Sequence, residues 1–271
     1  MYLCFVALAV SAASEQLFTL SDDQIYYSLD SGKSWHGIYV DSSEPVHFRD
    51  ICCCKGEKAI YSAVSFGVIK SSDNGKHWKK LYPAGYSENI NRIASSLDGA
   101  PVIYALSDSS FYRSGNGGKN WKSLSLPSSQ IFFIAPFYDS GRIYAAGGES
   151  LYVSSDGGHS WKRIGQGVFE GEVIVDMAAN PSNPKQVYLA TSGGLFYTGD
   201  GGKSWKNRSV SHKDWIQTQK IIWAPDNPGR LYSFDSDVKE NGASILRRSG
   251  DGGKSRGDIA TKDEIFLIAC A

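Results

Sequence analysis

One short stretch of the sequence contains residue types that could form a hydrolytic site. Residues 154 to 161 read SSDGGHSW, so Ser154, Asp156 and His159 lie within six positions. A serine, an acidic residue and a histidine are the groups that nucleophilic hydrolases combine, with the histidine as general base. Whether these side chains act together depends on the elements that carry them.

The same octapeptide pattern recurs along the whole chain. Each copy has Ser or Thr first, Asp or Asn third, Gly fifth, and Trp last except in the sixth copy. His159 corresponds to lysine in every other copy, which is not expected of a general base. We therefore interpret Ser154, Asp156 and His159 as part of a repeated structural turn. The six copies are SLDSGKSW (28–35), SSDNGKHW (71–78), SGNGGKNW (114–121), SSDGGHSW (154–161), TGDGGKSW (198–205) and SGDGGKSR (249–256).

Short apolar runs precede each octapeptide, and their composition is typical of β-strands. One run ends at the octapeptide, a third lies further upstream, such as FRDICCC (48–54), and a short segment follows each copy. Four strands in about 43 residues are typical of a β-propeller blade. The sequence therefore predicts an all-β fold, a single β-propeller of six or seven four-stranded blades with little helix. The middle run carries a tyrosine in five repeats, at Tyr61, Tyr104, Tyr144, Tyr188 and Tyr232.

The octapeptide resembles the Asp-box, also called the bacterial neuraminidase repeat, of a family of β-propellers. The stretch NPSNPKQVYLATSGGLFYTGDGGKSW (180–205) is similar to repeats of sialidases, xyloglucanase-type endoglucanases, sortilin-like receptors and photosystem II assembly factors. The resemblance covers nearly the whole chain and implies a propeller fold without specifying an activity. It also implies that each octapeptide forms the turn between a blade's third and fourth strands, opposite the face where ligands usually bind.

Each residue type that recurs among the six octapeptides suits such a turn. The Asp side chain accepts hydrogen bonds from nearby backbone N–H groups, Gly permits a positive φ, and Trp packs between strands. One carboxylate per copy is too few for a metal site, so neither a metal nor another cofactor is expected. The predicted structural residues are Asp30, Asp73, Asn116, Asp156, Asp200 and Asp251, with Trp35, Trp78, Trp121, Trp161 and Trp205.

The two ends of the chain leave the blade number open. Residues 1–13 have an apolar core followed by small residues, as at a signal-peptide cleavage site, although the segment is short and lacks Lys and Arg. Alternatively, they form the innermost strand of the first blade, before a propeller spanning 14–271. Residues 263–271 also resemble a first strand, so cleavage would let them close six blades, and retention would start a seventh. The expected location is secreted or extracytoplasmic in the first case and intracellular in the second.

Composition argues against some partners. Lys plus Arg and Asp plus Glu number 28 each, and binders of nucleic acid or anionic membranes usually carry a basic excess. Three adjacent cysteines lack the spacing of a zinc site. In a strand Cys52 and Cys54 share one face, and Cys53 points to the other. We expect a monomer without a membrane span in the mature chain, and with a protein or a glycan as its partner.

The candidate binding face is made by the loops that enter each first strand and those that join the second and third strands. Loop 206–219 is among the longest and contains His212 and Trp215. A cluster at the mouth of the central channel would bind an acidic or glycan group, or would consist of paired charges in a hydrated channel. Counting 24 residues back from the octapeptide acid places four side chains there, namely Arg49, Arg92, Phe132 and Asp176.

Two function classes follow from these residues. The favoured one is a non-catalytic binding or assembly scaffold, because the repeats are short and regular, as in photosystem II assembly factors. The alternative is a glycoside hydrolase or a glycan-binding propeller. Sialidases carry an Arg-Ile-Pro motif whose proline is missing from FRDI (48–51), and xyloglucanase-type enzymes place two catalytic aspartates between two propellers. The sequence therefore favours protein binding over hydrolysis.

Overall fold

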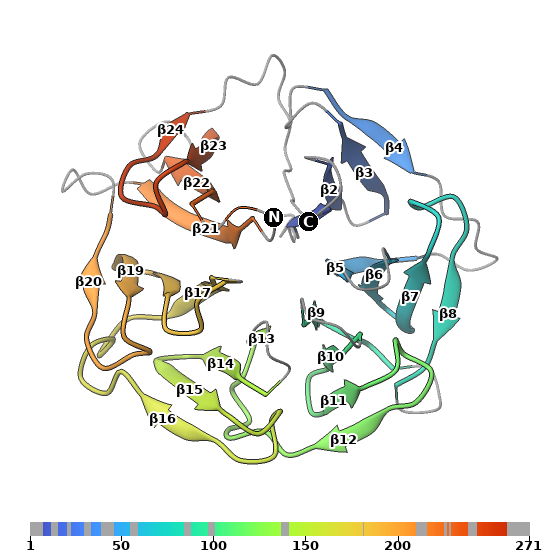
Figure 1. Ribbon diagram of the computed structural model, residues 1–271, viewed down its shortest axis with the longest axis horizontal. Coiled ribbons are helices and arrows are strands. Elements are labelled where there is room, and N and C mark those ends of the chain that lie inside the picture. The colour runs from blue at the N-terminus through green and yellow to red at the C-terminus, as the bar shows by residue number, and fades with distance from the viewer. Residues whose placement is uncertain are drawn as a thin grey trace.

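Antiparallel β-sheets arranged around a common axis build this protein (Figure 1). The structure, a computed structural model, shows an all-β β-propeller. The strands that it describes form six four-stranded sheets, and each sheet pairs its strands in chain order. The described residues are 8–11, 16–20, 23–29, 34–38, 46–54, 59–83, 88–96, 101–136, 141–180, 182–209, 216–224, 227, 229–237 and 243–258.

Each sheet has an inner strand beside the ring axis and an outer strand on the circumference (Figure 1). The inner strands are β1 (Leu8–Ser11), β5 (Phe48–Cys54), β9 (Arg92–Ser95), β13 (Phe133–Pro136), β17 (Ile174–Ala179) and β21 (Ile216–Trp223). The second strands are β2 (Gln16–Leu20), β6 (Ala59–Val64), β10 (Ile103–Leu106), β14 (Ile143–Gly147), β18 (Val187–Thr191) and β22 (Leu231–Asp237). The third strands are β3 (Ile25–Ser28), β7 (Gly67–Ser71), β11 (Phe111–Ser114), β15 (Ser150–Ser154), β19 (Gly194–Thr198) and β23 (Ala243–Ser249). The outer strands are β4 (His36–Ile38), β8 (Lys79–Leu81), β12 (Lys122–Leu124), β16 (Lys162–Ile164), β20 (Lys206–Asn207) and β24 (Gly257–Asp258).

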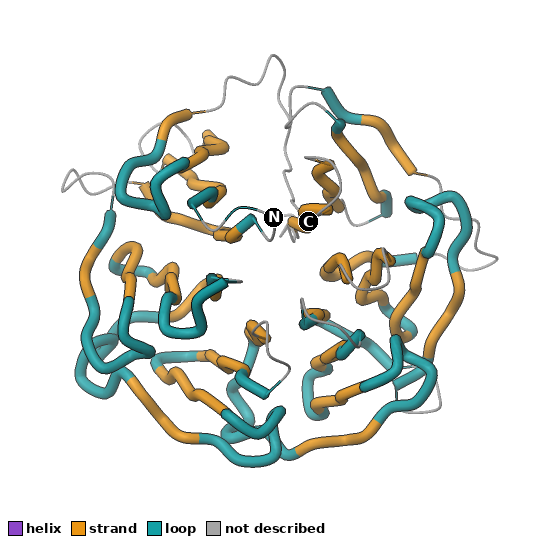
Figure 2. Tube along the Cα trace, viewed as in Figure 1, coloured by secondary structure: helices purple, strands orange, loops and turns teal. Residues whose placement is uncertain are grey.

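The predicted four-strand repeat is confirmed throughout the described part of the chain. Strands and turns make up all the secondary structure described there (Figure 2), and none of its elements is a helix able to cross a membrane. Residues 8–11 pair with β2 as an inner strand, whereas residues 1–7 and 263–271 lie outside the described residues. The total number of blades and the cleavage of residues 1–13 therefore stay predictions.

Apolar contacts between neighbouring blades form the core. Five buried clusters combine residues from consecutive sheets, and the cluster of the first two sheets also includes Tyr232 and Ala224 of the last sheet. The tyrosines of the second strands are almost completely buried, and two of their hydroxyls donate to a glycine carbonyl in the next blade's octapeptide. These bonds join Tyr61 to Gly117 (3.2 Å) and Tyr188 to Gly252 (3.0 Å).

The cysteines of β5 alternate as the strand period requires. Cys52 and Cys54 pack in the cluster shared with the third sheet, and Cys53 packs in the cluster shared with the first. Burial raises the pKa of the Cys52 and Cys53 thiols well above the usual value. Thiols held neutral in this way act as small apolar side chains.

The octapeptides form the turns between third and outer strands. In SSDGGHSW the Ser154 hydroxyl donates to Asp156 Oδ1 (2.7 Å) and accepts the Gly158 N–H (2.9 Å), while Asp156 Oδ1 accepts the Ser160 N–H (2.9 Å). Hydrogen bonds from Ser160 hold the pKa of Asp156 below its usual range. The same serine or threonine bonds occur in the copies that contain Asp73, Asn116, Asp200 and Asp251.

This geometry explains why Ser154, Asp156 and His159 are not a catalytic set. The Ser154 hydroxyl is buried and bonded within its own turn, and His159 is exposed. Gly158 has φ 94°, and the fifth-position glycine of the next sheet, Gly202, has φ 90°. A Cβ at Gly202 would lie 2.5 Å from Ile164 of the preceding blade, so the glycine serves the turn and the blade contact together.

Candidate functional site

The inner strands, which surround the ring axis, place a set of side chains at equivalent positions near their starts (Figure 1). Strand pairing identifies them, because each lies opposite the same position of its second strand. The pairs are Asp50 with Ala63, Arg92 with Leu106, Phe133 with Ala146, Asp176 with Ala190 and Lys220 with Phe234.

This set corrects the prediction from a constant offset of 24 residues. Irregular pairing between Phe48 and Asp50 inserts one residue into β5, so Asp50 rather than Arg49 occupies the equivalent position. The same kind of shift occurs in β17 just before Asp176. Phe132 lies just before β13, and Phe133 takes its expected place. A β-bulge adds a residue on one strand alone, so counting along the chain misses it.

The two inner-strand aspartates join neighbouring blades. Asp50 Oδ2 accepts the Ile93 N–H (3.0 Å), and Asp176 Oδ2 accepts the Ile221 N–H (2.8 Å). Both carboxylates are buried, and Lys220 Nζ lies 3.4 Å from Asp176 Oδ1. Burial raises the pKa of Asp176 above its ordinary value, although the charge of Lys220 opposes that shift. These carboxylates are therefore committed to the joints between blades.

Arg92 is the cation of the set that faces an aromatic ring. Its guanidinium lies 5.0 Å from the ring centroid of Phe133, within the range of a cation–π contact. Nη1 donates to the Asn91 carbonyl (3.1 Å), and Nε is buried without a hydrogen-bond partner among the described residues. Arg92 thus holds a half-buried positive charge at the start of β9.

Exposed apolar side chains lie beside these strands. Phe132 is 54 % exposed and Val173 is 53 % exposed, and each immediately precedes an inner strand. We call Arg92, Phe132, Phe133 and Val173, all at the starts of inner strands, the channel-mouth surface.

Hydrogen bonds hold this surface in place. The Phe132 N–H donates to the Ala146 carbonyl (3.0 Å), and the Val173 N–H donates to Ser192 Oγ (3.0 Å). The connections into the inner strands are therefore anchored to neighbouring second strands and their loops. An apolar surface on such fixed segments is suited to binding a partner.

The other predicted site residues are only partly described. Arg49 lies early in β5 and is half-buried, whereas His212, Trp215 and Asp30 lie outside the described residues. Among the residues that the structure describes, no group of three or more His, Cys, Asp or Glu side chains is placed to hold a metal ion. The sequence placed Phe132 in the predicted cluster but did not single out Val173, because apolar residues at strand starts are usually buried.

A buried ionic cluster in the sixth sheet is a feature that sequence reasoning detected only in part. Arg256 replaces the tryptophan of the other octapeptides, and its Nη1 donates to Ser233 Oγ (2.9 Å) and lies 3.7 Å from Asp235 Oδ2. Arg247 donates to Asp235 Oδ2 and to Asp258 Oδ1, both at 2.7 Å. The missing tryptophan was visible in the sequence, but its compensating carboxylate was not.

Comparisons with known proteins agree with the propeller fold. The profile of a family described as "Sortilin, neurotensin receptor 3" matches residues 149–264, which is less than half of the chain. No curated protein sequence matches.

Three solved structures illustrate the likeness. A structure of YCF48 bound to a D1 peptide has 18 % identity and a TM-score of 0.64, covering 90 % of this chain and 77 % of that one. A GH74 enzyme of Niastella koreensis has 14 % identity and a TM-score of 0.64, covering 97 % and 60 %. YCF48 of Cyanidioschyzon merolae has 15 % identity and a TM-score of 0.61, covering 96 % and 86 %. At these identities the likeness is one of fold, and by fold this chain is a β-propeller.

Proposed function

We propose that this protein is a non-catalytic β-propeller that binds a protein segment on its channel-mouth surface. The observation that carries the proposal is that Phe132 and Val173 are exposed apolar side chains at the starts of inner strands, and that the half-buried Arg92 cation, also at the start of an inner strand, contacts Phe133. Apolar anchors next to an arginine are typical of protein-binding surfaces. Two propellers of similar fold support this use, namely a YCF48 structure with a D1 peptide and a chain of a mitotic checkpoint complex.

The same proposal includes the Asp-box character of the repeat, the number of blades and the location of the protein. The octapeptide turns make the bonds expected of an Asp-box, and we propose that the repeat is one. We also propose a ring of six blades, supported by the contact of Tyr232 with the cluster of the first two sheets. Mature protein beginning near Ser14 would support a secreted location, whereas folded protein retaining Met1 would support an intracellular one.

The alternative is a glycoside hydrolase. Most such enzymes need two carboxyl groups, one of them a general acid, that flank the scissile bond. Asp176 is the acid that we would assign, but it is buried and bonded to Ile221 and Lys220. This commitment favours binding over hydrolysis. Assays on aryl glycosides and polysaccharides are therefore expected to be negative, and hydrolysis that disappears in Asp176→Asn would contradict the proposal.

Site-specific photo-cross-linking tests the binding surface. A photoreactive benzoylphenylalanine replaces Phe132 in the full chain, which is then irradiated in an extract of the native host. The expected result is one dominant adduct, because a specific partner must cover this exposed ring. The same replacement at Leu29 is the matched control, since Leu29 is 62 % exposed and belongs to an octapeptide on the opposite face.

A second substitution tests whether the adduct depends on the channel-mouth surface. Val173→Glu, introduced into the chain with the cross-linker at position 132, is expected to reduce the adduct about tenfold, because a buried unpaired charge at an interface is costly. Equal adducts from positions 132 and 29, or an adduct unaffected by Val173→Glu, would contradict binding at the channel mouth.

A further inference from the structure

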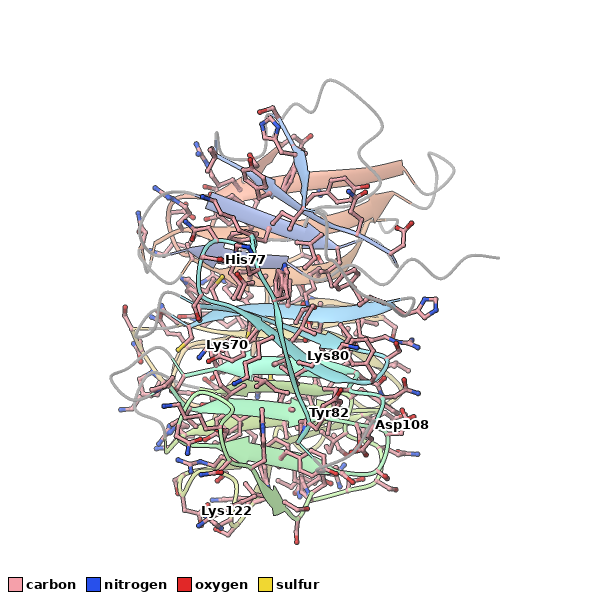
Figure 3. The ribbon with its side chains drawn as sticks, turned by 90° about the vertical axis from the view of Figure 1, so that its right-hand side faces the viewer. Lys70, His77, Lys80, Tyr82, Asp108 and Lys122 are labelled. Atoms are coloured by element: carbon pink, nitrogen blue, oxygen red, sulfur yellow. The ribbon has the colours of Figure 1, made fainter. Side chains whose placement is uncertain are left out.

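A groove on the circumference lies between the second and third blades, apart from the channel mouth. It has a volume of about 820 Å³ and is lined by the end of β7, by β8 and the residue after it, and by the two octapeptides on either side. Figure 3 views this side of the ring, with Lys70, His77, Lys80 and Tyr82 labelled around β8. Nothing in the channel-mouth proposal requires this groove.

Four lysines line the groove, and no other described pair of neighbouring blades has four. Lys79 and Lys80 lie on β8, Lys70 faces Lys79 across the sheet, and Lys119 comes from the next octapeptide. Between the other described pairs of neighbouring blades, fewer of the four corresponding positions carry Lys or Arg. There is one between the first and second blades (Tyr27, His36, Gly37, Lys76), and there are two between the third and fourth (Arg113, Lys122, Ser123, His159). There are three between the fourth and fifth blades (Val153, Lys162, Arg163, Lys203) and two between the fifth and sixth (Tyr197, Lys206, Asn207, Lys254).

The groove carries a net positive charge because its four lysines outnumber Asp73, the one acidic side chain in its lining, which is bonded within its own turn. Asp73 accepts hydrogen bonds from the His77 N–H (2.9 Å) and the Ser71 hydroxyl (2.8 Å), and its Oδ2 lies 2.6 Å from His77 Nδ1. Lys79 and Lys119 are exposed and form no ion pair with a described residue. Lys80 lies over the ring of Phe66, 4.5 Å from its centroid, and so stays close to β8.

Aromatic rings and a free strand edge complete the groove. Trp78 and Trp121 donate their indole N–H to glycine carbonyls of their own turns, at 3.0 and 3.1 Å, and remain half-buried. Tyr82 is 43 % exposed at the end of β8. β8 is the outermost strand of its sheet, so its outer edge has no neighbouring strand within that sheet. An extended peptide can add to such an edge through main-chain hydrogen bonds.

We propose that this groove binds an acidic peptide segment in extended conformation, added along β8. Carboxylates of the peptide would pair with Lys79 on one wall and Lys119 on the other, while its apolar side chains would contact Trp78, Trp121 and Tyr82. The strand edge favours a polypeptide over other polyanions, because only a polypeptide supplies backbone donors and acceptors that can pair with the N–H and C=O groups of the edge.

Fluorescence anisotropy with the full chain tests this assignment. The probe is a labelled peptide of about ten residues in which glutamate alternates with valine, a pattern that suits a strand with one charged face. We expect saturable binding that weakens as ionic strength rises from about 50 to about 200 mM. The double variant Lys79→Glu and Lys119→Glu is expected to bind the peptide at least about tenfold more weakly, because two attractions become repulsions.

The chain offers a matched control for charge. Lys162 and Lys203 occupy the same two positions in the groove between the fourth and fifth blades. Lys162→Glu with Lys203→Glu changes the net charge equally and is expected to leave affinity within about twofold. Circular dichroism verifies that both double variants are folded. Equal loss in both would contradict the proposal.

Two further probes separate strand addition from charge alone. A peptide that alternates glutamate with proline carries the same charge but has fewer backbone donors, so we expect it to bind at least about tenfold more weakly. Equal affinity of the two peptides would overturn strand addition. Absence of binding by the valine peptide, or its displacement by a sulfated oligosaccharide that binds more tightly at the same lysines, would overturn the peptide assignment.

Discussion

At the scale of single residues, the octapeptide works through short local bonds. The Ser154 hydroxyl both donates and accepts within its own turn, and Asp156 gathers donors from Ser154 and Ser160. Because each of these bonds spans at most four residues, the repeated sequence was enough to predict that the aspartate accepts local hydrogen bonds. The comparison of six copies also removed His159 from consideration as a base.

Ser154 offers a direct test of the turn. Ser154→Ala is expected to lower the free energy of unfolding by about 1 kcal/mol, because the buried Gly158 N–H loses its acceptor and Asp156 loses a donor. Urea denaturation measures the change. Ser155→Ala is the control, since Ser155 is the exposed neighbour in the same turn. Equal effects of the two substitutions would contradict this assignment of the bonds.

At the scale of elements, the inner strands connect one blade to the next. β5 and β17 each contain a register shift, after which an aspartate accepts a backbone N–H of the following inner strand. The position of β5 itself was predicted from the apolar run FRDICCC (48–54). The register shifts in β5 and β17 were not predicted, because an extra residue in a strand leaves no mark in the local pattern of residue types.

Asp176 tests this joint between blades. Asp176→Ala is expected to lower the free energy of unfolding by about 3 kcal/mol. The Ile221 N–H loses its acceptor, and the half-buried Lys220 ammonium loses its carboxylate partner. Asp176→Asn keeps an acceptor oxygen and should cost less. Urea midpoints compare the two variants. If both cost the same, the hydrogen bond to Ile221 is not what holds the joint.

At the scale of the whole molecule, the interfaces between blades differ although the blades repeat. Most contain the octapeptide tryptophan, whereas the sixth sheet contains Arg256 and Arg247 around the buried Asp235. Burial lowers the pKa of Arg256, and the charge of Asp235 opposes that shift. The sixth sheet thus uses paired charges where the other sheets use apolar packing.

Removal of the shared carboxylate tests this ionic cluster. Asp235→Ala is expected to lower the free energy of unfolding by about 3 kcal/mol or more, because two buried guanidinium groups lose their common partner. Asp258→Asn is the matched control at the same Arg247. The Asp258 side chain is 64 % exposed, so its loss should cost less than about 1 kcal/mol. Similar thermal midpoints for both variants would show that the cluster does not stabilise the fold.

The amino-acid sequence by itself determined the repeat, the order of strands within each blade and the bonds of each turn. These depend on the alternation of side chains along a strand and on hydrogen bonds between residues a few positions apart. Only the tertiary structure decided that Asp50 replaces Arg49 at the equivalent inner-strand position, that Asp235 accompanies Arg256, and that four lysines share one groove. Each of these pairs residues from different strands or different blades, and a contact across that distance follows from register and packing rather than from any local pattern.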